Sequence, residues 1–220
     1  MKRSLLTQFL VLMVLFPVIT AAKNIWIQAE DSESIVGKIT KGDDIGLQEK
    51  DAFDDFLVVM VKDNAQVEEW YAQYTVKIPK EGMWVIWGRF KHPAGRDVSW
   101  SFDGTGEGPN DIAIPKAMDN VNTGGEEWFW SSGNNSADLP VPNLKLNLPS
   151  GEVTFRIYER ESPLDSNGNS RLDLILLTDD LSYIPDDEAA ENGLEEQKRL
   201  RPVEGYHKLA TSWGFLKRGY

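Results

Sequence analysis

The sequence contains no cysteine and only two histidines, His92 and His207, in 220 residues. The lack of cysteine excludes a disulfide framework, a thiol nucleophile and a thiolate metal site. Two histidines leave a serine–histidine–aspartate triad or a multi-histidine zinc site with almost nothing to be built from. The fold must therefore be stabilised by core packing, and any metal ion must be held by oxygen ligands.

Basic residues are few relative to acidic ones. The chain has 23 Lys and Arg against 35 Asp and Glu, which gives a formal charge of -12. Such a surface repels phosphate backbones, so we expect no nucleic-acid partner. Aromatic residues, in contrast, are abundant, with eight Trp, six Tyr and nine Phe. Many tryptophans with few histidines indicate a surface that stacks on a ligand rather than one that transfers protons.

Residues 1–22 have the pattern of a secretion signal. Two basic residues precede a mostly apolar stretch from Leu5 to Ile19, and small residues follow it up to Ala22. The apolar stretch is shorter than the ~20 residues that a membrane helix needs. A cleaved signal peptide is therefore favoured over a membrane anchor. We expect cleavage after Ala22, a secreted or extracytoplasmic protein, and no stable membrane span in the mature chain.

Residues 23–185 alternate apolar and polar side chains with a period of two, which is typical of half-buried strands. The alternating segments, most of which end at Gly or Pro turns, begin near Ile25, Tyr74, Val98, Leu144 and Val153. A continuous apolar run, Leu172–Leu177, is typical of a strand that is covered on both faces. The pattern predicts an all-β domain, a β-sandwich or jelly roll, over residues 23–185.

Two segments stand apart from this pattern. The polar, glycine-rich residues 104–143 interrupt the strands and contain Trp128, Phe129 and Trp130. A loop of this length in a compact domain is usually functional or disordered, and the aromatic cluster favours order. Residues 186–220 form a charged C-terminal tail, helical or irregular. Its first part, residues 186–201, permits a helix that Pro202 would end. Its last part, residues 203–220, is either a docking segment for a protein partner or a membrane surface, or a segment that packs on the sandwich or frays.

The first and last strands carry polar side chains that suit a metal ion. Gln28 and Glu30 are two residues apart, so on one strand they point to the same face, and Asp173 interrupts the last apolar run. A buried carboxylate is costly unless it is paired or binds a cation. If the two strands are neighbours, these three side chains would bind Ca²⁺ through oxygen ligands. A salt bridge from Asp173 to an arginine, such as Arg171 or Arg156, is an equally good interpretation.

Four motifs occur in order and at regular spacing. They are Q-A-E-D at 28–31, W-Y-A-Q-Y-T-V-K-I-P at 70–79 with its continuation to Arg89, L-P-S-G-E-V-T-F at 148–155, and L-D-L-I-L-L-T-D-D at 172–180. Together they resemble the opening, middle and closing motifs of carbohydrate-binding modules of families 6 and 35. The Asn- and Gly-rich residues after Glu161, and the long segment 104–143, depart from the family pattern.

The resemblance implies a galactose-binding-domain-like β-sandwich that holds a polysaccharide or glycan and catalyses no reaction. It also implies that Gln28, Glu30 and Asp173 belong to a structural Ca²⁺ site. In many family members the sugar lies in a loop cleft, between aromatic rings and beside an Asn that precedes the final strand. The matching positions here are Trp70, Tyr71, Trp128, Trp130, Asn167 and Asn169. Aromatic planes stack on sugar CH faces, and amides both donate to and accept from hydroxyls.

Two other classes of function stay open, because a fold does not fix a function. A structural or adhesion sandwich at the cell surface would bind protein through a flat apolar patch. An enzyme would need a cleft with carboxylates of perturbed pKa, or a basic cluster such as Arg89, Lys91, His92 and Arg96. Sugar binding instead requires accessible aromatic rings with polar neighbours.

Overall fold

The computed structural model describes residues 22–59, 70–92, 100–104, 117–118, 125–132, 144–159 and 170–200. The predicted signal sequence, the predicted ligand residues Asn167 and Asn169, and the tail beyond residue 200 lie outside these described residues. Within them, no helix is both long and apolar enough to cross a membrane.

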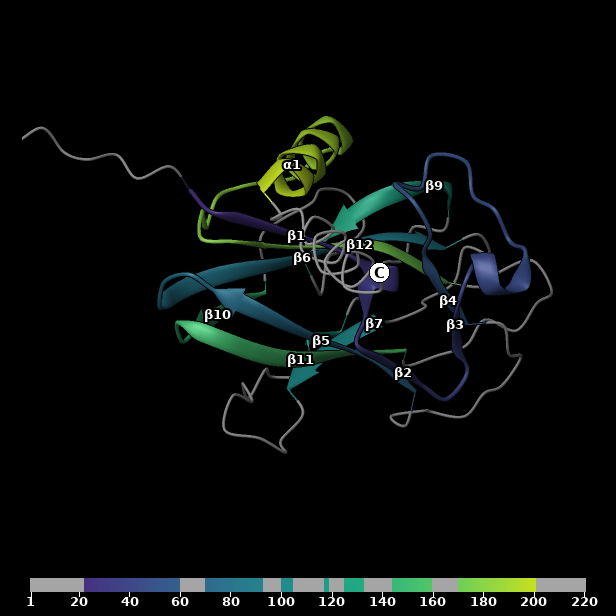
Figure 1. The fold of residues 1–220 in the computed structure, drawn as a ribbon, viewed down its shortest axis with the longest axis horizontal. Helices are drawn as coiled ribbons and strands as arrows, with labels where there is room; N and C mark the ends of the chain where they lie inside the picture. Colours follow the sequence, from purple (N-terminus) through teal and green to yellow (C-terminus); the bar gives the residue numbers. More distant parts are fainter. Residues whose placement is uncertain are drawn as a thin grey trace, which may run out of the picture.

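The described strands form two antiparallel sheets that face each other, which confirms the predicted all-β sandwich (Figure 1). The first sheet has seven strands, in the order β10 (Lys145–Leu148), β6 (Gly82–His92), β12 (Arg171–Thr178), β4 (Leu57–Val59) and β3 (Ile39–Lys41), with β1 (Asn24–Gln28) beside β12 and β9 (Gly125–Ser131) beside β6. The second has five, in the order β2 (Ser34–Val36), β5 (Tyr71–Ile78), β11 (Gly151–Glu159), β7 (Trp100–Gly104) and β8 (Ala117–Met118). The remaining elements are two 3₁₀ turns, Ala29–Asp31 and Asp43–Ile45, and one helix, α1 (Asp187–Leu200).

The main core lies between the two sheets and follows the period-two pattern of the strands. Trp84 of β6 and Phe155 of β11 are each 1% exposed, and the Phe155 ring stacks on Tyr74 with centroids 5.4 Å apart. The hydroxyl of Tyr74 donates to the carbonyl of Ala29 at 2.6 Å. This bond ties the five-stranded sheet to the 3₁₀ turn that follows β1.

Strand β12 lies at the centre of the seven-stranded sheet, and all eight of its residues are buried. Its partners are β6, β4 and β1, and Gln28 at the end of β1 lies opposite Leu174. The first and last strands are therefore neighbours, which is the condition that the predicted Ca²⁺ site requires. The pairing with β6 shifts between Leu172 and Leu174, so Asp173 is the extra residue of a β-bulge. Bulges re-aim a side chain next to a site.

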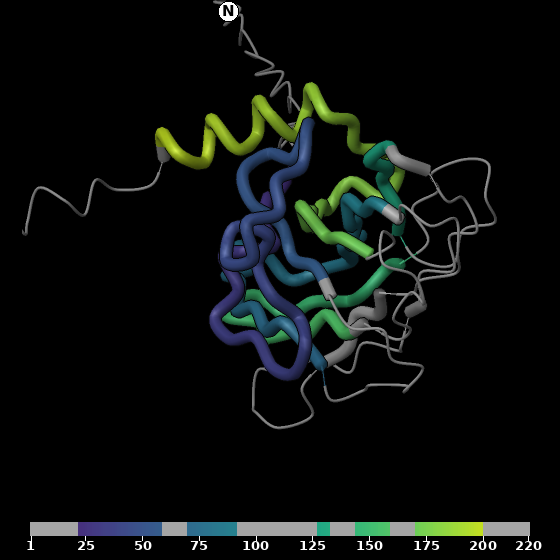
Figure 2. The backbone as a smooth tube through the Cα atoms, turned by 90° about the vertical axis from the view of Figure 1, so that its right-hand side faces the viewer, coloured from purple at the N-terminus to yellow at the C-terminus, as the bar shows by residue number. Residues whose placement is uncertain are grey.

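Helix α1 packs on the outer face of the seven-stranded sheet, the face turned away from the main core (Figures 1 and 2). Ala190 and Leu194 bury the Trp26 side chain of β1, together with Trp87 of β6. The amide of Gln197 accepts from the Trp26 backbone N–H at 2.7 Å and donates to its carbonyl at 2.8 Å. Asp187–Leu200 therefore pack on the sandwich as a helix, whereas residues 203–220, for which a docking segment was considered, lie outside the described residues.

Candidate functional site

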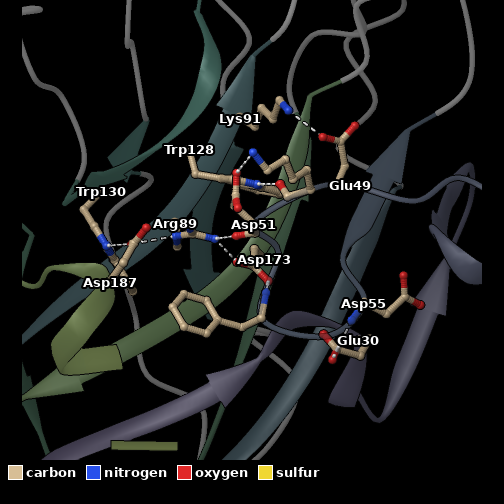
Figure 3. Close-up of polar contacts among 12 residues, drawn as sticks. Glu30, Glu49, Asp51, Asp55, Arg89, Lys91, Trp128, Trp130, Asp173 and Asp187 are labelled. Carbon is tan, nitrogen blue, oxygen red and sulfur yellow. Dashed lines mark hydrogen bonds and ion pairs between the residues drawn. The ribbon is translucent and has the colours of Figure 1, made fainter. Parts of the chain in front are cut away.

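A pocket of about 580 Å³ opens on the outer face of the seven-stranded sheet, beside the first residue of α1 (Figure 3). Its volume is within the range of small-ligand sites. The lining comes from a loop after the second 3₁₀ turn, from three strands and from α1, and consists of Glu49, Lys50, Asp51, Arg89, Lys91, Glu127, Trp128, Arg171 and Asp187. We call this cavity the outer-face pocket.

The alternation of β6 explains why charged side chains lie here. Val85 and Trp87 point to the outer face and are covered by α1. Arg89 and Lys91 continue the same row beyond the helix, because residues two apart share a face. Arg171 lies opposite Lys91 in the β12–β6 register. The outer face is thus apolar under α1 and charged where the helix begins.

Arg89 is only 1% exposed and has a partner for each of its nitrogens. It binds Asp173 directly through Nη1, which also donates to the carbonyl of Asp51 at 3.0 Å. Its Nε and Nη2 donate to the two carboxylate oxygens of Asp187 at 2.9 and 2.6 Å. The guanidinium lies 4.6 Å from the Phe53 ring centroid and 5.0 Å from that of Trp128. A buried cation held by two carboxylates fixes the floor of the pocket.

Lys91 and Arg171 share Glu49 as their carboxylate partner. All three side chains are nearly buried, at 12%, 10% and 11% exposure. Burial lowers the pKa of Arg171, and the carboxylate of Glu49 acts in the opposite direction. Because the guanidinium pKa starts so high, Arg171 is still a cation at neutral pH.

The structure places Trp128 and Trp130 of β9 on the outer face, but in different surroundings. Trp128 is half-buried, lines the outer-face pocket and donates from Nε1 to the carbonyl of Lys50 at 3.3 Å. Trp130 packs edge-on against Trp26, with centroids 5.8 Å apart, and donates to Asp187 at 3.0 Å. Trp130 therefore belongs to the packing of α1, whereas Trp128 lies where a ligand can reach it.

Trp70 and Tyr71 are not brought together with these tryptophans. Trp70 is 8% exposed and belongs to the main core. Its ring lies so close to Gly37 that a Cβ there would be 1.9 Å from Trp70 Cδ1. Tyr71 is half-buried on the five-stranded sheet, where its ring contacts Tyr158 at 5.6 Å and Arg156 lies 4.1 Å from its centroid. The predicted aromatic residues thus lie on two different sheets.

Gln28 and Glu30 do not share a strand face, because β1 ends at Gln28 and Glu30 lies in the 3₁₀ turn Ala29–Asp31. The side chain of Gln28 donates to Asp54 at 3.5 Å. One carboxylate oxygen of Glu30 accepts from the backbone N–H of Asp55 at 3.4 Å. Its other oxygen, Oε2, is buried and has no hydrogen-bond partner.

Asp173 forms the predicted salt bridge, but with Arg89 rather than with Arg156 or Arg171. The pairing of Arg89 with Asp173 could not be predicted from the sequence, because β6 and β12 become neighbours only in the folded sheet. The other carboxylate oxygen of Asp173 accepts from the backbone N–H of Phe53 at 3.2 Å. Both oxygens are therefore engaged. Within the part of the chain that the structure describes, no three His, Asp or Glu side chains converge as a metal site.

Two of the predicted metal ligands, Glu30 and Asp173, differ in how well they suit a cation. Burial raises the pKa of Glu30 from its usual 4.5 to about 8, and the nearby charge of Asp173 adds to the effect. An orphaned buried carboxylate oxygen is what a cation would satisfy. Burial also raises the pKa of Asp173 to about 6, although the Arg89 guanidinium acts in the opposite direction. Glu30 is thus suited to a cation, whereas Asp173 already has one.

Glu49 and Asp187 were not predicted as site residues, and Arg89 and Lys91 were considered only as part of a basic cluster for an enzyme. One local signal was available for the cations, because Arg89 and Lys91 alternate with apolar residues in a strand that is otherwise buried. Glu49 and Asp187 carry no such signal. They reach the pocket from a loop and from a helix start that only the tertiary structure brings to β6.

The comparisons with known proteins concern the fold. No family model matches the chain, and no curated protein matches it. Among solved structures, the chain is similar to the C-terminal family 6 carbohydrate-binding module of a marine laminarinase from Zobellia galactanivorans, with 17% identity over 71% of this chain and 99% of that chain and a TM-score of 0.44. It is similar to a family 6 module of a Cellvibrio mixtus lichenase in complex with cellotriose, with 19% identity, 73% and 98% coverage and a TM-score of 0.41. It is also similar to a family 35 module from Clostridium thermocellum, with 14% identity, 70% and 97% coverage and a TM-score of 0.46. These modules represent the two families whose motifs the sequence resembles.

Proposed function

We propose that this chain is a secreted, non-catalytic carbohydrate-binding protein that holds a polysaccharide or glycan in the outer-face pocket. The observation that carries the proposal is the composition of that pocket. It combines one accessible indole, Trp128, with charged donors and acceptors held in fixed positions by ion pairs. Sugars present apolar CH faces and many hydroxyls, so an aromatic plane beside fixed polar groups suits them. Asn167 and Asn169, which lie outside the described residues, remain predicted sugar-binding residues whose side-chain amides would bind hydroxyls.

The pattern of pKa shifts favours binding over hydrolysis. A glycosidase uses two carboxyl groups at the bond to be cleaved, and the general acid has a raised pKa. The carboxyl groups with a raised pKa among the described residues are Glu30 and Asp173. Neither lines the outer-face pocket, where Glu49 and Asp187 are engaged with buried cations. We therefore propose a role in holding the glycan rather than in cleaving it.

Replacing Trp128 by alanine is expected to weaken glycan binding at least about tenfold, because one aromatic stacking contact and its buried area are lost. The measurement is a glycan-array and polysaccharide screen, followed by calorimetric titration with the best ligand. Tyr71→Ala is the matched control, since Tyr71 is half-buried on the opposite sheet. Loss of binding in Tyr71→Ala with none in Trp128→Ala would move the site to the five-stranded sheet. If no glycan binds the unchanged protein, the sugar-binding proposal is wrong and a protein partner becomes the next candidate.

We also propose a structural Ca²⁺ at the turn after β1, held by Glu30 with Gln28 beside it. The support is the buried Oε2 of Glu30, which has no partner. A bound Ca²⁺ would neutralise this carboxylate and tie the turn to the sandwich. Ca²⁺ at about 100 times its Kd should raise the free energy of unfolding by about 2.7 kcal/mol. Thermal unfolding in Ca²⁺, in Mg²⁺ and in chelator measures this, and Glu30→Gln should remove the effect of Ca²⁺. If Ca²⁺ stabilises Glu30→Gln as much as it stabilises the unchanged protein, any bound Ca²⁺ lies at another site.

A further inference from the structure

Helix α1 supplies one residue of the outer-face pocket, although it follows residues 23–185, the segment predicted to form the sandwich. This residue is Asp187, the first of the helix, whose two carboxylate oxygens bind Nε and Nη2 of Arg89 (Figure 3). The same carboxylate accepts from the indole Nε1 of Trp130 at 3.0 Å. One side chain therefore joins α1 to β6 and to β9, the strands that carry Arg89 and Trp128.

Arg89 contacts Trp128 in two ways. Its guanidinium carbon lies 5.0 Å from the ring centroid of Trp128, within the range of a cation–π contact. Its Nη1 donates to the carbonyl of Asp51 at 3.0 Å, and the preceding residue, Lys50, accepts from the Trp128 indole at 3.3 Å. Asp187 holds the other two nitrogens of the guanidinium. The orientation of the Trp128 ring therefore depends on Arg89, and that of Arg89 depends on the start of α1.

The far end of α1 is attached to β1, away from the pocket. The side-chain amide of Gln197 exchanges two hydrogen bonds with the backbone of Trp26, at 2.7 and 2.8 Å. Gly193 lies against the same residue, since a Cβ at Gly193 would be 2.0 Å from the indole Nε1 of Trp26. Gln197 is not among the described residues that line the pocket, and it is about 15 Å from Asp187 along the helix axis. A change at Gln197 therefore reaches the pocket through the docking of α1.

Helix α1 is marginal by itself. A helix of 14 residues gains little from its own hydrogen bonds in water, and Gly193 in its interior lowers its helix propensity further. Its stability comes from the sheet, where Ala190 and Leu194 are buried beside Trp26 and Trp87. Folding and docking of α1 are therefore one equilibrium, on which the contacts at both of its ends act.

From these contacts we infer that Asp187 is a positioning residue of the outer-face pocket: the docked helix holds Arg89, and Arg89 holds Trp128 in the position where a ligand stacks on it. Ligand binding and docking of α1 then stabilise each other, because coupling between two sites is reciprocal. The ligand part rests on the proposed function, since the glycan is the one proposed for the same pocket. The effect of α1 on Trp128 needs no ligand, so it is measured separately.

The first measurement is made on the full chain without ligand. Gln197→Ala removes both bonds to Trp26, so amide hydrogen exchange of residues 188–200 should become about tenfold faster. The indole NMR resonance of Trp128, assigned through Trp128→Phe, should shift in the same variant. Glu196→Ala, at an exposed neighbouring residue of α1, is the matched control and should change neither. Faster exchange of α1 with an unmoved Trp128 resonance would overturn the inference, because the helix would then only cover Trp26.

Asp187→Asn acts from the other end of α1. It weakens the ion pair with Arg89, and it should shift the Trp128 resonance in the same direction as Gln197→Ala does. Glu188→Gln removes the same charge from the first turn of the helix and is the control for this variant. A shift in Asp187→Asn without one in Gln197→Ala would also overturn the inference, since Asp187 would then act within the pocket and not through docking. Circular dichroism and thermal unfolding confirm that each variant is folded.

Binding gives the second measurement, with laminarin, xylan, galactomannan and polygalacturonate as probes. The probe that the unchanged protein binds best should bind about fivefold more weakly to Gln197→Ala, and it should slow the amide exchange of α1 in the unchanged protein. Equal affinity of the two proteins for this probe would overturn the coupling and leave the proposed function standing. If the unchanged protein binds none of the probes, the proposed function is wrong for these glycans, and the Trp128 resonance alone decides the positioning role of Asp187.

Discussion

Replacing Arg89 by methionine is expected to lower the free energy of unfolding by about 3–5 kcal/mol. The substitution leaves Asp173, which is 1% exposed, without its cation. It also removes the ion pair between the first residue of α1 and β6, since Arg89 holds both carboxylate oxygens of Asp187. Urea unfolding monitored by tryptophan fluorescence measures the change, and the melting temperature should fall by about 10 °C.

The double variant Arg89→Met, Asp173→Leu separates the loss of the ion pair from the loss of packing. Replacing a buried ion pair by apolar side chains is often nearly neutral. The second substitution should therefore restore most of the stability, because Asp187 is 56% exposed and can be solvated. If the double variant is as unstable as Arg89→Met alone, the stability comes from the contacts of Arg89 with Phe53 and Trp128 instead. Lys77→Met serves as the control for losing an exposed cation.

In the presence of chelator, the stability of the protein should fall as the pH rises from about 4.5 to about 8. Burial raises the pKa of Glu30 from 4.5 to about 8, so in this interval the folded chain keeps a proton that the unfolded chain releases. Unfolding is therefore favoured by increasing pH. The destabilisation caused by Glu30 is absent below pH 4.5 and complete above pH 8, where it is on the order of 5 kcal/mol. Chemical denaturation at a series of pH values measures it.

Glu30→Gln is the decisive comparison for this pH dependence. Glutamine has no proton to lose, so the variant should be more stable than the unchanged protein at pH 8 and should match it near pH 4.5. Asp173 contributes a dependence of the same sign, because burial raises its pKa to about 6, and this part should persist in the variant. Glu152→Gln, at an exposed carboxyl of β11, is the control. If Glu30→Gln and the unchanged protein have identical pH profiles, the Glu30 carboxyl is not buried and protonated in the folded protein.

Local pattern was sufficient to predict the strands that carry the core. The run Leu172–Leu177 predicted a strand covered on both faces, and the structure buries it between the main core and α1. The short strands β2, β3 and β4 were not predicted. Each has only three residues, which is too few for an alternation to be recognised. β2 forms beside the long strand β5, β4 forms beside the long strand β12, and β3 adds to β4.

Spacing along the chain was a poor guide to the site. Gln28 and Glu30 would share a face only if β1 continued, and the 3₁₀ turn after Gln28 separates them. Trp70 and Trp128 match the same family feature in the sequence, yet one is in the main core and the other lines the pocket. An aromatic residue in a β-rich chain can serve either purpose, and burial decides which.

The sequence by itself determined the class of the fold, the strands of the core and the presence of a buried carboxylate at Asp173, because these follow from periodicity and from the cost of burying a charge. Tertiary structure alone decided that Arg89 is the partner of Asp173, that α1 covers Trp26, and that Glu49 and Asp187 complete the outer-face pocket. The physical reason is that ion pairs act over a few ångströms of space, whereas these partners are separated by tens of residues along the chain.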